Sequence, residues 1–225
     1  MTRTAGSAGR TGVPMSPPES LADPPRKLAR FSPVERFAHR STAVLVLVLI
    51  ATGFSLFYQP LALIVGRRPI VEAIHVVAGF LLPVPTFIAL LSAEFRADLG
   101  HLNRFAPDDW EWLRRRDRRR SSLAVHKFNA GQKLAAACFG AAGVVLFGTG
   151  LLLLFPDQLS LSDGVRQGAT VVHDATTLAL VALLAGHARL AMRHPEARAA
   201  MRTGVMDAEY ARREYAAWAA SEEKE

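Results

Sequence analysis

Four long apolar segments constrain the fold of this chain more than any other feature of its sequence. They span residues 37–58, 69–94, 129–155 and 167–192. A helix needs about 20 residues to cross a hydrocarbon core of about 30 Å, and each segment is long enough. None shows the two-residue alternation of a transmembrane barrel strand. The sequence therefore predicts an all-α membrane protein, a bundle of four transmembrane helices.

The composition agrees with apolar segments separated by strongly charged ones. Hydrophobic residues make up 50% of the chain, although the formal net charge is +7. This pairing argues against intrinsic disorder and against a simple nucleic-acid-binding domain. The single cysteine, Cys138, excludes a disulfide framework and a cysteine-based zinc or iron–sulfur site. We expect Cys138 to be a small core residue.

The flanking segments differ in composition from the bundle. Residues 1–30 are rich in Gly, Pro and Ser, and we expect them to form a disordered tail. The transmembrane domain is expected over residues 31–195, followed by a cytoplasmic C-terminal tail over 196–225. The first apolar segment begins too far along the chain, and is too long, to be a cleavable signal peptide. Pro83 and Pro85 should kink the second helix.

Lysine and arginine predict the orientation. They are concentrated before the first helix, in the loop between the second and third helices and after the fourth, whereas the other two loops carry only Arg67, Arg68 and Arg166. The positive-inside rule then places both termini and the middle loop in the cytoplasm of a bacterium, with the chain crossing the cytoplasmic membrane several times. The run RRRDRRR at 114–120 is either this topology signal in contact with anionic lipid or a docking site for a soluble partner.

Four histidines lie within the predicted helices, where histidine is costly and usually functional. His39 opens the first helix and His187 is near the end of the fourth, so both lie toward the cytoplasmic face. His75 and His173 are near the starts of the second and fourth helices, toward the outer face. Topology alone therefore predicts two pairs, His39 with His187 and His75 with His173.

The spacing on the fourth helix supports this pairing. His173 and His187 are fourteen residues apart, about 21 Å along a helix, and project from nearly the same face. Two imidazoles fill both axial positions of a haem iron, and the chain has no CxxCH for covalent attachment. We therefore expect two b haems that transfer electrons. Each histidine alone could instead be an interfacial or hydrogen-bonded side chain.

Other residues have a functional and a structural interpretation, and the sequence leaves both open. Glycines near the haem levels could admit flat porphyrins or serve helix packing; they are Gly53, Gly79, Gly143, Gly150 and Gly186. Arginines at the cytoplasmic level could pair with haem propionates or only set the topology; they are Arg36, Arg40, Arg189 and Arg193. Glu94, Asp98 and His126 are candidate proton relays, whereas the surface interpretation is favoured for His101, His126 and His194.

The motifs RFSPVERFAHR (30–40), EAIHVVAGF (72–80), KFNAGQK (127–133) and MRTGVMDAEYARREYAAW (201–218), together with His173 and His187, carry a resemblance. The chain resembles the gamma subunit of membrane-bound formate dehydrogenases, a dihaem cytochrome b of the wider cytochrome b561 and nickel–iron hydrogenase cytochrome b superfamily. The resemblance spans about residues 30–218. KFNAGQK is the most specific of these motifs.

The resemblance implies that His39, His75, His173 and His187 ligate two b haems in the pairs given above. It also implies a menaquinone or other quinone site at the cytoplasmic end, with Asn129, Gly131 and Gln132 in the quinone loop next to His187. Without the resemblance, this loop could equally be the start of a helix with a snorkelling Lys133.

The partners that the resemblance implies are an iron–sulfur subunit and a catalytic molybdenum or tungsten formate dehydrogenase subunit, since this chain has no primary-substrate site of its own. Electrons would pass from the iron–sulfur partner to the outer haem, then to the inner haem and the quinone. The alternatives are the cytochrome subunit of a hydrogenase or of a sulfur-compound reductase, and a haem-free membrane anchor or transporter.

Overall fold

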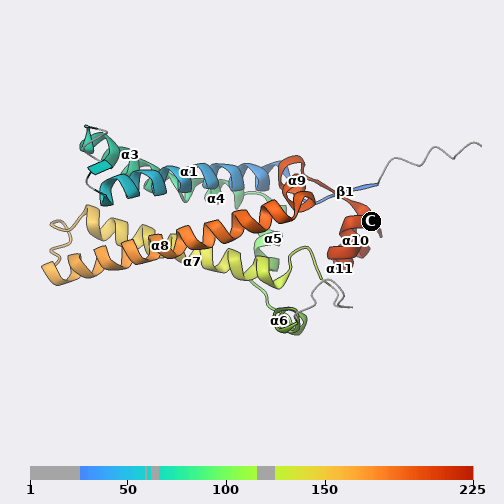
Figure 1. Cartoon of the computed structure of the whole chain (residues 1–225). Helices are drawn as coiled ribbons and strands as arrows, with labels where there is room; N and C mark the ends of the chain where they lie inside the picture. Colours follow the sequence, from blue (N-terminus) through green and yellow to red (C-terminus); the bar gives the residue numbers. More distant parts are fainter. Residues whose placement is uncertain (1–25, 59, 62–65, 116–124, 225) are drawn as a thin grey trace, which may run out of the picture.

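A computed structural model describes residues 26–58, 60–61, 66–115 and 125–224. Its main body is a bundle of long helices (Figure 1), namely α1 (Pro33–Phe57), α3 (Arg68–Leu81), α4 (Val84–Ala89), α7 (Ala130–Leu154) and α8 (Asp163–Arg193). Helix α1 packs against α3 and α4, and α7 packs against α8. With α3 and α4 taken together, four segments among the described residues are long and apolar enough to cross a membrane, so the expected four-helix bundle is confirmed.

The helices begin earlier than the apolar segments because polar residues cap them. The Ser32 hydroxyl accepts a hydrogen bond from the backbone of Glu35, and the Glu35 carboxylate accepts one from the Ser32 amide at 2.6 Å. Ser162 caps α8 in a similar way, through the amide of Val165. These caps satisfy amides that a helix start leaves without partners. The first and fourth helices therefore extend beyond the expected starts at residues 37 and 167.

The second span is broken at its prolines. Helix α3 ends at Leu81, and the Leu82 amide bonds back to Gly79 at 3.3 Å before α4 begins. Pro83 cannot continue the helical ladder because it lacks an amide hydrogen. The expected kink is thus a break between two helices. The span also ends at Ala89 rather than near residue 94, because Ser92 caps a new helix, α5 (Ala93–Leu102).

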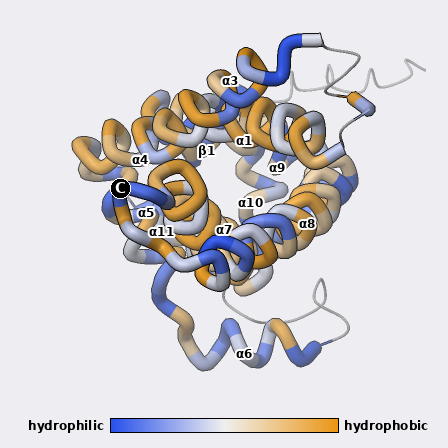
Figure 2. The backbone as a smooth tube through the Cα atoms, turned by 90° about the vertical axis from the view of Figure 1, so that its left-hand side faces the viewer, coloured by the Kyte–Doolittle hydropathy of each residue, from blue (hydrophilic) through white to orange (hydrophobic). Residues whose placement is uncertain are grey.

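The outer surface of the bundle is apolar. Val44, Val144 and Leu178 are 61%, 75% and 71% exposed. Seen along the bundle, the long helices are mostly hydrophobic, whereas α6 (Pro107–Arg114) lies beside them and is more hydrophilic (Figure 2). Such a surface suits lipid rather than water. The expectation that Cys138 is a core residue is wrong, since it is exposed on α7. In a bundle with an apolar exterior, an apolar neighbourhood does not imply burial.

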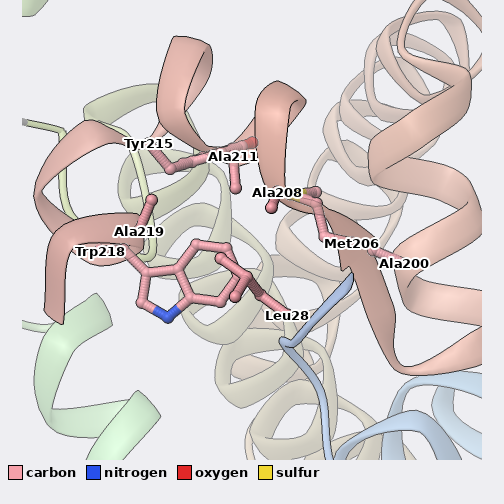
Figure 3. Close-up of a cluster of buried hydrophobic side chains, with 8 residues drawn as sticks. All are labelled: Leu28, Ala200, Met206, Ala208, Ala211, Tyr215, Trp218 and Ala219. Carbon is pink, nitrogen blue, oxygen red and sulfur yellow. The ribbon is translucent and has the colours of Figure 1, made fainter. Parts of the chain in front are cut away.

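A small folded unit, here named the C-terminal cap, closes one end of the bundle. It contains α9 (Pro195–Thr203), β2 (Val205–Asp207), α10 (Ala208–Glu214) and α11 (Ala216–Glu222), and β2 pairs antiparallel with β1 (Lys27–Ala29). Its core is a cluster of buried side chains (Figure 3): Leu28, Ala200, Met206, Ala208, Ala211, Tyr215, Trp218 and Ala219.

The cap changes two expectations about the ends of the chain. Residues 196–225, expected as a tail, are folded up to Glu222. The expected disorder of residues 1–30 is wrong for Lys27–Ala29, because pairing with β2 orders them. Residues 1–25 lie outside the described part of the chain. Arg30 belongs to the cap as well, since its guanidinium lies 3.7 Å from the centre of the Tyr215 ring.

Gly204 joins the cap to α1. It ends α9 with φ of 92°, a conformation that favours glycine, and a Cβ there would lie 2.8 Å from the Phe31 carbonyl oxygen. The amides of Arg30 and Phe31 donate to the Gly204 carbonyl at 2.8 and 3.0 Å. The side chains of Arg36 and Arg40 donate to the Arg202 carbonyl at 3.1 and 2.6 Å. These bonds tie the first turns of α1 to the cap.

Candidate functional site

The structure brings the four helix histidines together in two pairs. The ring centres of His75 on α3 and His173 on α8 lie 6.4 Å apart. Those of His39 on α1 and His187 on α8 lie 6.3 Å apart. We name these the far-end pair and the cap-end pair, because His39 and His187 lie toward the C-terminal cap and the other two toward the opposite end. The far-end rings are half-buried, and the cap-end rings are exposed.

This spacing fits one metal atom between two imidazoles. A metal–imidazole nitrogen bond is about 2.0–2.1 Å, and the ring centre lies roughly 1.1 Å further on, so two opposed rings on one metal have centres about 6.3 Å apart. Among the described residues, no group of three or more His, Cys, Asp or Glu side chains could hold a metal ion. A metal with two protein ligands needs the rest from another source, and haem supplies four from its porphyrin. The residues present therefore fit haem iron.

The far-end histidines make hydrogen bonds that the sequence did not reveal. Thr52 Oγ1 lies 2.9 Å from His75 Nδ1, and Thr149 Oγ1 lies 2.9 Å from His173 Nδ1. The backbone of Leu49 also interacts with the His75 ring, and that of Leu146 with the His173 ring. The histidine on one helix is thus held by a threonine on its neighbour, α1 for His75 and α7 for His173.

The glycines near the haem levels have different surroundings. A Cβ at Gly53 would lie 3.3 Å from His75 Cε1, and one at Gly150 would lie 3.7 Å from His173 Cε1. Only the contact at Gly53 is tighter than an ordinary van der Waals contact, so Gly53 lets the His75 ring approach the backbone, whereas a Cβ at position 150 would fit. A Cβ at Gly79 would reach only Leu49, at 4.0 Å, and at Gly143 or Gly186 it would meet nothing within 4 Å.

The cap-end pair has an aromatic neighbour. The Phe139 ring on α7 meets His187 edge to face, with centres 5.7 Å apart. Arg36 and Arg40, expected near this level, use guanidinium nitrogens on the Arg202 carbonyl, which is a structural role. Arg189 and Arg193 are exposed on α8.

Asn129 and Gln132 form a capping box at the start of α7. Asn129 Oδ1 accepts from the Gln132 amide at 2.9 Å, and Gln132 Oε1 accepts from the Asn129 amide at 3.0 Å. Gln132 Nε2 lies 3.4 Å from the Tyr215 hydroxyl. The side-chain oxygens thus serve the helix start, and the amide NH₂ groups are the donors that a ligand could use.

Gly131 and a small cavity lie beside this capping box. A Cβ at Gly131 would be 3.2 Å from Cη2 of Trp112, so the indole packs directly on the glycine. A cavity of about 30 Å³, lined by residues that include Trp112, His126 and Asn129, adjoins this contact. It has room for about one water molecule and not for a quinone ring.

Two groups of buried charges lie beside the same helix start. Lys127 Nζ is 2.6 Å from Asp98 Oδ2 and 3.7 Å from Glu35 Oε1. Burial and a hydrogen bond to Glu35 raise the pKa of Asp98 to about 7, although Lys127 opposes the shift. In the second group, Lys133 Nζ is 2.6 Å from Asp109 Oδ2 and 2.9 Å from the Arg104 carbonyl oxygen.

Of the candidate proton relays, only Asp98 is buried in such a group. Glu94 is exposed and bonded to Ser92, a contact that lowers the pKa of its carboxyl. His126 and His101 are exposed, and His194 links α8 to α9.

A helical membrane bundle with two opposed imidazole pairs is typical of a membrane cytochrome of the b type. A family model described as prokaryotic cytochrome b561 matches residues 30–204. The chain therefore belongs to the prokaryotic cytochrome b561 family: it is an integral membrane protein that binds b haem and transfers electrons. A search of curated proteins gives no match.

Proposed function

We propose that this chain is the membrane cytochrome b subunit of a formate dehydrogenase-like respiratory complex, with two b haems and a quinone as electron acceptor. The observation that carries the proposal is the pair of matched spacings, 6.3 and 6.4 Å, between imidazoles from different helices. Each haem, when bound, supplies an iron that accepts and releases one electron. His39 with His187 and His75 with His173 would each hold one iron from two sides, which would leave no site open for oxygen.

The chain's own residues supply the ligands and the electrostatic setting. His75 and His173 would hold the far-end haem, and His39 and His187 the cap-end haem. Helix α8 contributes one ligand to each, which fixes the separation of the two sites at about 21 Å along that helix. The haem-free anchor is disfavoured, because the family binds b haem.

The quinone is proposed to bind at the cap end, beside the start of α7. Asn129 and Gln132 would donate from their amide nitrogens to a quinone carbonyl, and Gly131 would let the ring approach the backbone. Trp112 now packs on Gly131, so a ring placed there requires the indole to move. The buried Asp98 carboxyl, with Lys127 and Glu35 around it, is proposed to hold a proton for quinone reduction.

The partners are proposed to be an iron–sulfur subunit and a molybdenum or tungsten subunit that oxidises formate. The motif KFNAGQK supports this placement over the alternatives, the cytochromes of hydrogenases and of sulfur-compound reductases. Both ends of the chain and the middle loop are proposed to face the cytoplasm of a bacterial cell, on the strength of their basic residues.

The test is haem stoichiometry and electron source in the intact complex purified from membranes. The proposal expects two b haems per chain, both reduced by formate, and co-purifying iron–sulfur and molybdenum or tungsten subunits. Reduction by hydrogen or by a sulfur compound, with formate inert, would favour an alternative complex. A colourless protein would end the cytochrome assignment itself.

Ligand variants test the pairing. His187→Ala should lose one haem and quinone reduction while the far-end haem stays reducible, and His75→Ala should lose the other. His101→Ala, at an exposed histidine, is the control and should keep both. Two haems per chain in His187→Ala would show that the pairing is wrong.

A further inference from the structure

A five-residue pattern occurs twice, once in each half of the bundle. Residues 49–53 read LIATG on α1, and residues 146–150 read LFGTG on α7. Both have the form Leu-x-x-Thr-Gly. In each copy the leucine backbone and the threonine hydroxyl contact one far-end histidine, and the glycine lies against the same ring. We name each copy a threonine–glycine clamp.

The clamps define which ring nitrogen of each histidine carries the proton. The Thr52 hydroxyl lies 2.7 Å from the Val48 carbonyl oxygen, and that of Thr149 lies 2.7 Å from the Val145 carbonyl oxygen. Two oxygens this close need a hydrogen between them, and a hydroxyl has only one to donate. Toward the imidazole each threonine must therefore accept. Nδ1 of both rings is therefore the donor.

With Nδ1 protonated, Nε2 of His75 and His173 carries the lone pair that a metal needs. The hydrogen bonds also fix the ring orientation, because a threonine hydroxyl holds Nδ1 of each ring. Gly53 completes its clamp, because a Cβ at position 53 would lie 3.3 Å from His75 Cε1 and the ring would have to shift.

The cap-end pair differs. Among the hydrogen bonds of the described residues, none involves the ring of His39 or of His187. An imidazole that binds a metal through one nitrogen and donates the N–H of its other nitrogen to an acceptor becomes a more electron-rich ligand, and a more electron-rich ligand stabilises the oxidised iron. The clamps therefore act on one haem site and leave the other unchanged.

We propose that Thr52 and Thr149 are positioning residues that orient the far-end histidines and lower the reduction potential of that haem relative to the cap-end haem. This inference rests on the proposed dihaem function. It gives the electron path a direction, since electrons then pass downhill from the far end to the cap end, where the quinone is proposed to bind.

The experiment is a potentiometric titration of the purified complex with Thr52→Val and Thr149→Val, singly and together. Valine keeps the shape of threonine and removes the acceptor. Haem content should remain at the wild-type value, and the lower of the two midpoint potentials should rise. At a fixed ambient potential the ratio of oxidised to reduced far-end haem should fall roughly fivefold for each lost hydrogen bond. One of the two low-spin ferric resonances should shift as well.

Two further variants complete the design. Thr170→Val removes a threonine that bonds its own helix carbonyl at 3.0 Å in the same way, and both potentials should stay unchanged. Thr52→Ser keeps the hydroxyl and should restore the wild-type potential. If valine variants lose the far-end haem while Thr52→Ser keeps it, the hydroxyl is needed for ligand orientation, which supports the inference.

Unchanged potentials and resonances in the double valine variant would overturn the inference, as would loss of haem in both the serine and the valine variants. These failures differ from failure of the proposed function. If the wild-type protein lacks two haems, the proposed function is wrong. If it has two haems and the clamps do not alter either potential, only this inference is wrong.

Discussion

Asn129 combines a structural and a proposed functional role that substitution can separate. Its Oδ1 caps α7, whereas its Nδ2 is the proposed quinone donor. Asn129→Ala should lose both, and the lost cap costs about 1 kcal/mol of stability. Asn129→Asp keeps a capping oxygen but has no amide donor. We expect this variant to keep both haems and the wild-type melting temperature, and to reduce quinone roughly fivefold more slowly, the effect of one lost hydrogen bond.

Stopped-flow reoxidation of reduced haem by a soluble quinone, beside thermal melting, measures both roles. If Asn129→Asp reduces quinone at the wild-type rate, the Asn129 amide does not bind the quinone, and Asn129 serves only to cap α7.

Asp98 gives a pH prediction. Its pKa is about 7 in the folded protein, raised from an ordinary value near 3.8 by burial and by Glu35. Between these values the folded chain binds a proton that the unfolded chain lacks, so this carboxyl's contribution to stability falls as the pH rises from about 4 to about 7. The facing charged groups are Glu35, Lys127 and Arg30.

The check is the melting temperature of the purified protein, followed by loss of haem absorbance, across this pH window. Asp98→Asn should flatten the decline seen in the wild-type protein. Glu94→Gln, at an exposed carboxylate, is the control and should behave like wild type. Equal slopes for wild type and Asp98→Asn would mean that Asp98 is ionised throughout.

At the scale of elements, one buried ion pair fastens α6 to α7. Lys133 on α7 and Asp109 on α6 have side chains that are 7% and 11% exposed. Lys133→Met would leave the Asp109 carboxylate buried without its partner, which typically costs about 3–5 kcal/mol. The double variant Lys133→Met with Asp109→Asn should recover most of this loss. Asparagine removes the charge and keeps an oxygen for the Ala106 amide that Asp109 now caps at 2.8 Å.

Chemical unfolding followed by circular dichroism compares the single and double variants. If the single and double variants lose the same free energy of unfolding, the loss comes from the missing contacts of Lys133 and not from the unpaired Asp109 carboxylate.

The sequence predicted the helices that are determined by a continuous run of apolar residues. It did not predict the features that depend on contacts between segments far apart in the chain. Apolar length predicted the four spans, and the positions of His39, His75, His173 and His187 along them predicted which rings would meet. The β1–β2 pairing was not predictable, because it joins three-residue strands at opposite ends of the chain. The Leu-x-x-Thr-Gly repeat of the threonine–glycine clamps was not predicted, although both copies stand in the sequence at 49–53 and 146–150. Each copy contacts a histidine only because its helix is next to the helix that carries this histidine. Only the packing of the helices determines which helices are neighbours.

At the scale of the whole molecule, the cap, α5 and α6 gather at one end, while the end of α1, the start of α3 and the connection between α7 and α8 lie at the other (Figure 1). The connection at the cap end is direct: Arg30 donates to the Lys127 carbonyl at 2.6 Å, and the Ala217 amide donates to the Val125 carbonyl at 3.1 Å. The strand β1, residues 125–127 and the C-terminal cap must therefore share one side of any membrane the bundle crosses. Their basic residues predict that this side is the cytoplasm.

The single cysteine makes this orientation measurable. In a Cys138→Ser background, Leu159→Cys places a thiol in the last inter-helix loop and Lys224→Cys places one beyond the cap, both at exposed positions. A membrane-impermeant maleimide added to intact spheroplasts should label position 159 and leave position 224 unlabelled until the membrane is permeabilised. The opposite pattern would put the cap and the buried Asp98 outside the cell. Protons for quinone reduction would then be taken from the outer side, and electron transfer from the far end would no longer run inward across the membrane.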